Sequence, residues 1–469
     1  MVFSSHIFLF YFLPLLLLIY YNLPHRWRNL FLTISSYLFY GWWNPWFSLL
    51  MLFATAANYL AGRVISRPGA SERQRFTALV LGVTASLGAL AFFKYFMFLE
   101  NNMNSLLWLF GADALPTLRV ILPIGISFFT FQSLSYSVDV YRRQSPPVRS
   151  FSDFACFVAL FPQLIAGPIV RYNTVAEQLV HRQHTASKFS SGVSMFILGF
   201  AQKILLANPM GEIANSAFAA DTPLPMDAWM GAVAYAFQIY FDFNAYSSMA
   251  IGLGRMVGFE FPKNFNAPYL ADSITDFWRR WHISLSTFLR DYLYIPLGGN
   301  RKGPRRTYIN LALVMILGGA WHGAHWNFIA WGAWHGGLLA LERWGGKKSI
   351  YGKLPHVLRI GITFVLVVFS WVLFRSPTLA EAMHYFGCMF GIPDPGNGAV
   401  LLAADIYTPR LMFMMALCAF LCFQRKQAFD LVTDRPCTWR HPAILIPLFV
   451  LCLMAMFAQS YNPFLYFQF

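Results

Sequence analysis

The sequence predicts an all-α polytopic membrane protein, and three observations support this fold class. The chain of 469 residues is 57% hydrophobic and only 12% charged, with a mean hydropathy of +0.49. A water-soluble protein of this length cannot bury so much apolar surface, whereas a lipid bilayer accommodates it. Apolar segments recur along the whole chain, and basic residues gather in alternate loops between them.

The apolar segments predict a bundle of about ten to twelve transmembrane and re-entrant helices, since a spanning helix needs roughly 20 mainly apolar residues. We expect one integral-membrane domain over residues 1–469, with a motif-bearing core at about 120–342 and C-terminal helices at 358–460. The candidate spans lie near 6–22, 30–43, 46–62, 77–98, 119–140, 189–208, 228–253, 358–374, 410–424 and 442–460.

Two further apolar regions fit a simple span poorly. Pro162, Gly167 and Pro168 interrupt the region 153–170, and the region 308–342 is rich in Gly, Trp and His. Broken segments at membrane depth persist only inside protein or beside a water-filled cavity. Both regions are therefore candidates for lining an internal site.

Loop charges indicate how the chain is oriented. Arginines follow the third and fifth candidate spans, at Arg63, Arg67, Arg73 and Arg75 and at Arg142, Arg143 and Arg149. The segments 100–117, 209–227 and 376–409 contain acidic residues but neither Lys nor Arg. By the positive-inside rule the basic loops are cytoplasmic and both termini lie outside. This topology requires that 153–170 re-enters without crossing and that 308–342 returns to the side it came from.

The segment 317–337, LGGAWHGAHWNFIAWGAWHGG, holds three histidines among tryptophans and glycines: His322, His325 and His335. Ionisable residues within apolar segments are costly, so a functional role is their default interpretation. Imidazole titrates near neutral pH, which suits a general base. The small residues in this segment permit close helix packing: Gly323, Ala324, Gly332, Gly336 and Gly337.

Two other interpretations of these histidines stay open. His322 and His325 could share a helical face and bind a metal, but no Asp, Glu or Cys lies nearby to complete a ligand set, so we expect no metal. A structural histidine that hydrogen-bonds a carbonyl group is the alternative for His325 and His335.

The segment 275–294, TDFWRRWHISLSTFLRDYLY, predicts an amphipathic helix at the cytoplasmic interface. Its polar stripe would carry Arg279, His282, Ser286 and Arg290, either at the mouth of a cavity or against anionic headgroups. The segment 238–255, QIYFDFNAYSSMAIGLGR, is too polar to face lipid, so it packs against other helices or lines a tunnel.

Three segments resemble the membrane-bound O-acyltransferase (MBOAT) family, most closely its alginate O-acetyltransferases and their cellulose-acetylating homologues: QIYFDFNAYSSMAIGLGRMVGFEFPKNFNAPY, SITDFWRRWHISLSTFLRDYLYIPLGGNRKG and GGAWHGAHWNFIAWGAWHG. Three earlier segments resemble the family too: MVFSSHIFLFYFLP at 1–14, LPIGISFFTFQSLSYSVDVYRR at 122–143 and LFPQLIAGPIVRYN at 160–173. The resemblance therefore runs from residue 1 to about 342. It implies the MBOAT fold, helices around a funnel open to the cytoplasm. It maps the family's catalytic histidine to His322 and a second family histidine to His282.

The resemblance also sets expectations for substrates and partners. It implies O-acetylation of an exopolysaccharide across a bacterial inner membrane, with acetyl-CoA as donor substrate, no bound cofactor, a periplasmic acetyltransferase partner, lipid contacts and no nucleic acid. We expect further polar and aromatic residues near the histidines to bind substrate: Arg279, Arg290, Asn244, Tyr246, Trp321 and His325. The family pattern YFDFSGYSDMA appears here as YFDFNAYSSMA, so no role of its Asp transfers to Ser248.

Three alternatives remain at this point. The chain could be a transporter or flippase of the acetyl donor or the polysaccharide, or a scaffold for an exopolysaccharide machine. It could also be an acyltransferase of another specificity, such as D-alanyl transfer to teichoic acid.

Overall fold

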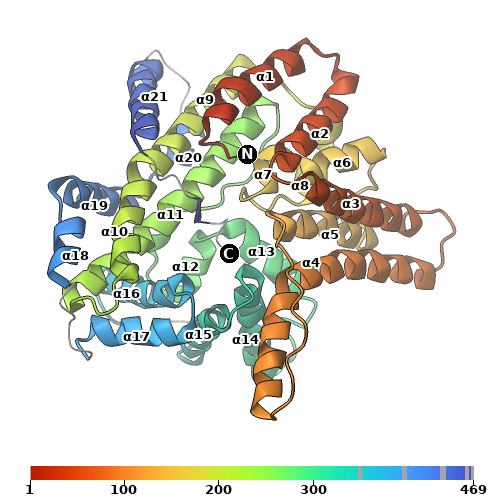
Figure 1. The fold of residues 1–469 in the computed structure, drawn as a ribbon. Helices are drawn as coiled ribbons and strands as arrows, with labels where there is room; N and C mark the ends of the chain where they lie inside the picture. The colour runs from red at the N-terminus through yellow and green to blue at the C-terminus, as the bar shows by residue number, and fades with distance from the viewer. Residues whose placement is uncertain (1, 347–350, 393–398, 434–439, 460–463, 466–469) are drawn as a thin grey trace. The chain divides into compact units, whose positions relative to one another are not determined.

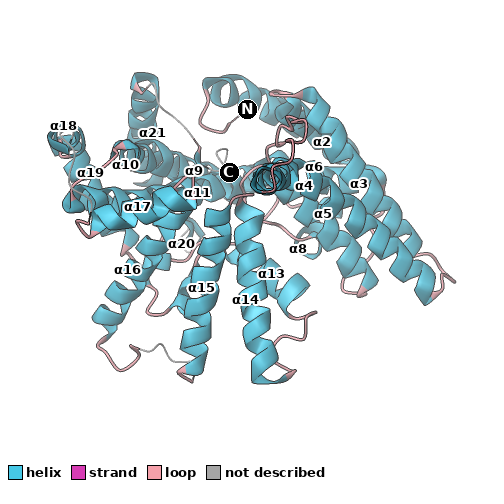
Figure 2. Cartoon of the chain, turned by 60° about the horizontal axis from the view of Figure 1, so that its bottom comes forward, coloured by secondary structure: helices cyan, strands magenta, loops and turns pink. Residues whose placement is uncertain are grey.

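The structure is a computed structural model that describes residues 2–346, 351–392, 399–433, 440–459 and 464–465 (Figure 1). Every regular element in these ranges is a helix, and Figure 2 shows the same absence of strands. The all-α fold class is thus confirmed over this part of the chain. The residues form two compact units, Met1–Val193 with Met249–Pro262 and Ser194–Ser248 with Lys263–Phe469. The single domain expected over 1–469 stays a prediction.

The first unit begins with a π-helical turn, η1 (Phe8–Phe12), and continues through helices that are mostly apolar. These helices are α1 (Leu13–Asn22), α2 (His25–Gly41), α3 (Pro45–Ile65), α4 (Glu72–Leu109), α5 (Ile126–Tyr141), α6 (Phe151–Ala159), α7 (Phe161–Leu164) and α8 (Tyr172–Val180). Sequence-encoded caps fix the starts of two of them. Asn44 caps α3, and Ser71 forms a reciprocal capping box with Gln74 at the start of α4.

The second unit contains the remaining elements, and α9 (Ala186–Ala201) and α11 (Pro225–Met256) contribute residues to both units. Its first half holds η2 (Gln202–Ala207), α10 (Asn208–Ala219), η3 (Pro268–Leu270), α12 (Ile274–Arg280), α13 (Ile283–Leu289) and η4 (Arg290–Tyr294). Its second half holds α14 (Gly303–His322), α15 (Trp326–Trp344), α16 (His356–Arg375), α17 (Leu379–Met389), α18 (Ala399–Ile406), α19 (Pro409–Cys422), α20 (Ala428–Thr433) and α21 (Arg440–Ala458).

Within the ranges that the structure describes, four helical stretches are long and apolar enough to cross a bilayer: Pro45–Ile65, Glu72–Leu109, Ala186–Ala219 and His356–Arg375. In the same ranges three shorter apolar helices cover Phe8–Asn22, Pro409–Cys422 and Pro442–Ala458. Each of the ten predicted spans coincides with helix over most of its length. Helices α11, α14 and α15 are not among these apolar stretches. Polar residues in α11, and Gly and His residues in α14 and α15, lower their hydropathy.

One predicted span begins later than expected. The sequence pattern placed a span at 119–140, but α5 starts at Ile126 and residues 112–123 are not helical. Pro123 cannot donate a backbone hydrogen bond, and Gly125 adopts a left-handed conformation with φ of 79°. These two residues exclude a continuous helix across 119–126.

The prediction of a single amphipathic helix over 275–294 is wrong. The segment is divided into α12, α13 and η4, because His282 adopts a left-handed backbone conformation with φ of 43°. The break separates the residues of the expected polar stripe. His282 is fully buried, whereas Arg279 and Arg290 are exposed.

The region 308–342 folds as a helical hairpin, in which α14 and α15 lie side by side and residues 323–325 connect them (Figure 2). A Cβ atom on Gly319 would lie 2.2 Å from the carbonyl oxygen of Phe328, and one on Gly332 would lie 2.4 Å from that of Met315. Glycine therefore permits this close approach, as expected for Gly332. Gly337 faces open space and takes no part in the packing.

Candidate active site

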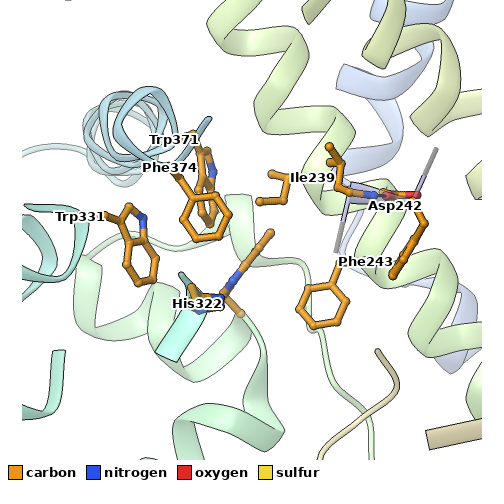
Figure 3. Close-up of a pocket in the computed structure, with 10 residues that line it drawn as sticks. Ile239, Asp242, Phe243, His322, Trp331, Trp371 and Phe374 are labelled. Atoms are coloured by element: carbon orange, nitrogen blue, oxygen red, sulfur yellow. Dashed lines mark hydrogen bonds between the residues drawn. The ribbon is translucent and has the colours of Figure 1, made fainter. Parts of the chain in front are cut away.

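A narrow cavity in the second unit contains the predicted catalytic residue His322. Its empty volume, counted together with its open mouth, is about 400 Å³ (Figure 3). Helix α11 supplies Ile239, Asp242 and Phe243, and the break between α12 and α13 supplies Trp281. The other lining residues are His322, Trp331, Trp371, Phe374, Phe464 and Leu465. Asp242 and His322 are the two acid–base groups among these ten residues.

His322 is the last residue of α14, and its side chain is half-buried. The carbonyl groups at a helix C-terminus stabilise a nearby positive charge. Gly323 follows in an extended conformation, and a Cβ atom there would lie 2.1 Å from the Phe328 ring, so a glycine lets the chain turn directly after His322.

Aromatic rings enclose the His322 imidazole. The ring centroids of Trp331 and Phe374 lie 5.3 Å and 5.2 Å from its centroid, and that of Trp321 lies 4.9 Å away. All three contacts are edge-on. Rings in this arrangement hold the orientation of the imidazole and shield part of it from water.

Asp242 lines the same cavity but is already bound to other groups. Its Oδ1 lies 2.6 Å from Lys203 Nζ, and both side chains are at most 4% exposed. Its Oδ2 accepts a hydrogen bond of 2.8 Å from the backbone N–H of Leu465. These contacts fix the Asp242 carboxyl group and tie Leu465, with its neighbour Phe464, into the cavity wall. Lys203 lies in the π-helical turn η2, a type of element frequent at functional sites.

His282 lies at the break between α12 and α13, and its hydrogen bonds define its tautomer. Asn264 Nδ2 donates a hydrogen bond of 3.0 Å to the Ser247 hydroxyl, which fixes the orientation of the Asn264 amide. Asn264 Oδ1 accepts two hydrogen bonds from Ser284, one from its backbone N–H at 3.2 Å and one from its hydroxyl at 2.8 Å. His282 Nδ1 lies 3.2 Å from the same Asn264 Oδ1, which can only accept. Nδ1 therefore carries the proton, and the lone pair is on Nε2.

The environment of His282 keeps this imidazole neutral. Burial lowers its pKa to about 3, because the low-dielectric interior disfavours the charged form. Its Nε2 is buried and has no hydrogen-bond partner among the described residues. The Trp321 ring is close to both predicted catalytic histidines, with its centroid 6.3 Å from that of His282 and 4.9 Å from that of His322.

His335 is also fully buried, one turn beyond Trp331 on α15. The indole N–H of Trp278 donates to His335 Nδ1 over 3.3 Å, so Nε2 carries the imidazole proton. The ring stacks on Phe277 at 6.1 Å and meets Trp331 edge-on at 4.9 Å. This arrangement locks Trp331, a wall residue of the cavity, in place.

The structure does not bring all the predicted substrate-binding residues to the cavity. Trp321 is buried beside His322, whereas His325 is exposed at the start of α15. Asn244 is buried and donates to Gln202 at 3.2 Å, and Tyr246 packs on the Phe464 ring at 4.6 Å. Arg290 is exposed and paired with Asp291 at 2.6 Å, and Arg279 is exposed.

Sequence reasoning missed several residues of the cavity wall, Phe243, Trp371, Phe374, Phe464 and Leu465, and it also missed Lys203, the partner of the wall residue Asp242. The sequence could have indicated Lys203 and Asp242, since a charge inside an apolar segment requires a partner. It could not indicate the aromatic residues, because such residues are common in any membrane helix. Across the described residues, no three His, Cys, Asp or Glu side chains gather as metal ligands would.

The chain matches known proteins over its full length. Residues 75–345 match the model of MBOAT, the membrane-bound O-acyltransferase family. A probable alginate O-acetylase AlgI of Pseudomonas putida is 44% identical over 489 residues, covering 100% of both chains. The corresponding Pseudomonas aeruginosa protein is 48% identical over 390 residues, 83% of this chain and 75% of the relative.

A peptidoglycan O-acetyltransferase of Helicobacter pylori is 34% identical over 519 residues, covering 100% of this chain and 98% of the relative. The matched region contains the helical hairpin and both predicted catalytic histidines. The chain is an acyltransferase that belongs to the membrane-bound O-acyltransferase family.

Proposed function

We propose that this chain is an inner-membrane O-acetyltransferase that passes acetyl groups from cytoplasmic acetyl-CoA towards an exopolysaccharide, with His322 as the general base. The single observation that carries the proposal is the chemistry of the cavity. Its two acid–base groups are Asp242 and His322, and Asp242 is bound to Lys203 and Leu465. We assign proton uptake to His322, which lines this cavity at the C-terminal end of α14.

In the proposed reaction, an acceptor hydroxyl and the donor thioester meet beside His322. The imidazole removes the hydroxyl proton as the oxygen attacks the thioester carbonyl carbon, and a C–O bond forms. The C–S bond then breaks, and the departing thiolate takes the proton back from the imidazolium. The products are an acetyl ester and coenzyme A, and no acyl group is held on this histidine.

The helix end and the aromatic wall support both steps of this reaction. The C-terminal carbonyls of α14 stabilise the transient imidazolium of His322. The apolar rings exclude water, which protects the thioester from hydrolysis and strengthens electrostatic interactions. We assign His282 Nε2 the role of hydrogen-bond acceptor for a substrate N–H or O–H group, because its lone pair is fixed there.

The relatives guide the choice of polymer and of cellular setting. The two alginate-acetylating relatives are 44% and 48% identical, compared with 34% for the peptidoglycan enzyme. We therefore propose alginate, or the chemically similar acceptor cellulose, as the final polymer. A periplasmic acetyltransferase partner would receive the acetyl group from this chain, and a funnel open to the cytoplasm would admit the donor.

The test in cells replaces the native copy with variants of the full chain. His322→Ala should abolish acetylation of the secreted polysaccharide while the protein stays in the membrane fraction. The matched control is His356→Ala, because His356 is exposed at the start of α16 and does not line the cavity. Normal acetyl content with His322→Ala would overturn the proposal and favour a scaffold.

The donor is tested with purified protein offered acetyl-CoA and an aminoacylated carrier protein in competition. Consumption of acetyl-CoA with release of coenzyme A is the expected result. Use of the carrier protein alone would indicate D-alanyl transfer instead. Movement of the donor across vesicles without any coenzyme A release would indicate a transporter.

A further inference from the structure

A second cleft lies in the first unit, among the ends of three packed helices. It is lined by the end of α3 and the loop after it (Ile65, Ser66, Arg67, Gly69, Ala70), by Arg75 of α4, and by Val140, Arg143, Gln144, Ser145, Pro146 and Pro147 at and after the end of α5. We call this the arginine cleft. Its volume is about 1030 Å³ including its open mouth. Figure 1 shows α3, α4 and α5 packed together within this unit.

The arginine cleft carries positive charge that its own lining does not neutralise. Arg67, Arg75 and Arg143 line it, and no Asp or Glu does. Outside the lining, the acid Glu72 is exposed; its Oε2 lies 3.6 Å from Arg75 Nη1 and its Oε1 accepts from the Tyr141 hydroxyl at 2.7 Å. One exposed carboxylate, already shared with Tyr141, leaves a net positive cleft.

Two buried polar groups at the arginine cleft have no partner among the residues that the structure describes. Ser145 is 8% exposed, and its hydroxyl makes no hydrogen bond. The Nε of Arg75 is buried and also makes none. An unsatisfied buried polar group costs free energy, so a ligand that bonds both groups would be favoured.

The backbone presents Arg143 at a position where glycine is usual. Helix α5 ends with a bond of 2.8 Å from the Gln144 N–H to the Asp139 carbonyl, and Arg143 has a left-handed φ of 59°. A non-glycine residue is strained there. Arginine at this site therefore places a guanidinium at the cleft at some cost in stability.

The location of the arginine cleft indicates the source of its ligand. It opens where the loop 66–71 joins α3 to α4, and both helices are long and apolar enough to cross a bilayer. A loop between two spanning helices lies at the membrane surface, where phospholipid phosphates are concentrated. Guanidinium groups bind phosphate oxygens in bidentate pairs, and basic pockets between membrane helices bind anionic headgroups.

We propose that the arginine cleft binds the phosphate of an anionic phospholipid headgroup, held by Arg67, Arg75 and Arg143 with the Ser145 hydroxyl. This site is distinct from the cavity around His322 and does not depend on the acyltransferase proposal. Bound lipid would brace the loops after α3 and α5 against the membrane surface.

The test measures lipid binding to the purified full-length protein by native mass spectrometry. Phosphatidylglycerol should bind more tightly than zwitterionic phosphatidylcholine. Arg75→Gln should weaken phosphatidylglycerol binding about tenfold, the effect of losing one charge-assisted hydrogen bond. Arg73→Gln is the matched control, because Arg73 is exposed on the same helix and does not line the cleft.

Arg143→Gly separates loss of binding from loss of folding. Glycine suits the left-handed backbone, so this variant should be at least as stable as the wild type while binding phosphatidylglycerol about tenfold more weakly. Equal binding by all four proteins would overturn the proposal. Equal affinity for both lipids, with full displacement by inorganic phosphate, would assign the cleft to a soluble phosphate and also overturn it.

Discussion

Asn264 Oδ1 lies 3.2 Å from His282 Nδ1 and also accepts the backbone N–H of Ser284. One amide oxygen thus fixes both the start of α13 and the tautomer of a fully buried imidazole. His282 itself has a left-handed backbone with φ of 43°, where α12 and α13 are separated.

The first prediction concerns this amide. Asn264→Ala leaves His282 Nδ1 and the Ser284 N–H without their acceptor, and each unsatisfied buried donor costs about 1–3 kcal/mol of stability. The rate of acetyl transfer should fall as well, since His282 is free to change tautomer. Thermal unfolding in detergent and turnover of acetyl-CoA check the two effects. Unchanged values of both would show that Asn264 does not orient His282.

The second prediction concerns acid stability. The folded protein holds the pKa of His282 at about 3, while an unfolded chain has a histidine pKa of about 6.5. Between these values the unfolded state binds more protons, so the free energy of unfolding falls as pH falls from 6.5 towards 3. Between pH 7 and 4.5, His282 should account for a loss of about 2–3 kcal/mol in the free energy of unfolding of the wild type. The variant His282→Gln should not show this part of the loss. Parallel acid dependence of unfolding in both proteins would contradict the assignment.

The third prediction concerns the buried ion pair of Lys203 and Asp242. Lys203→Met leaves an uncompensated buried carboxylate and should destabilise the protein by about 3–5 kcal/mol. Adding Asp242→Asn removes that charge and keeps an acceptor for the Leu465 N–H, so the double variant should recover much of the loss.

The control for this experiment is Lys263→Met. Lys263 and Asp430 are also 2.6 Å apart, but their side chains are 21% and 23% exposed. Solvent screens this pair, so its loss should cost no more than about 1 kcal/mol. Similar melting temperatures for Lys203→Met and Lys263→Met would show that burial does not make the Lys203 pair special.

The fourth prediction compares two glycines of α15. A Cβ atom on Gly332 would lie 2.4 Å from the Met315 carbonyl oxygen, so Gly332→Ala should push the hairpin apart and cost about 1–3 kcal/mol. Gly337 meets nothing within 4 Å, so Gly337→Ala should gain about 0.5–1 kcal/mol from helix propensity. Unfolding curves of the two variants should shift in opposite directions, and shifts of the same sign would argue against the packing.

The helical architecture could be predicted because it depends on the length and polarity of each segment. The breaks could be predicted less well. The interruption near Pro162 has a local cause in the sequence, the proline itself. Helix α6 ends at Ala159, and Pro162 lies in the first turn of α7. The break at His282 has no local cause, because a left-handed histidine is fixed by its tertiary bonds to Asn264, which lies 18 residues earlier. The prediction of one continuous amphipathic helix over 275–294 is wrong for this reason.

The site could be predicted only in part, for a similar reason. His322 stood out as an ionisable residue in an apolar segment, and a sequence motif supported it. Trp371 and Phe374 reach the cavity from α16 through tertiary packing, and Phe464 and Leu465 reach it through the bond to Asp242. No periodicity or composition marks such residues, since their role depends on which helices become neighbours.

The most direct test of the account measures coenzyme A release by purified wild type and His322→Asn, with binding of acetyl-CoA measured in parallel. Asparagine keeps a polar group of similar size but cannot take up a proton. We predict a fall in turnover of about 10²–10⁴-fold with little change in the affinity for acetyl-CoA, the signature of a lost general base. Turnover at the wild-type rate would contradict the assignment of His322.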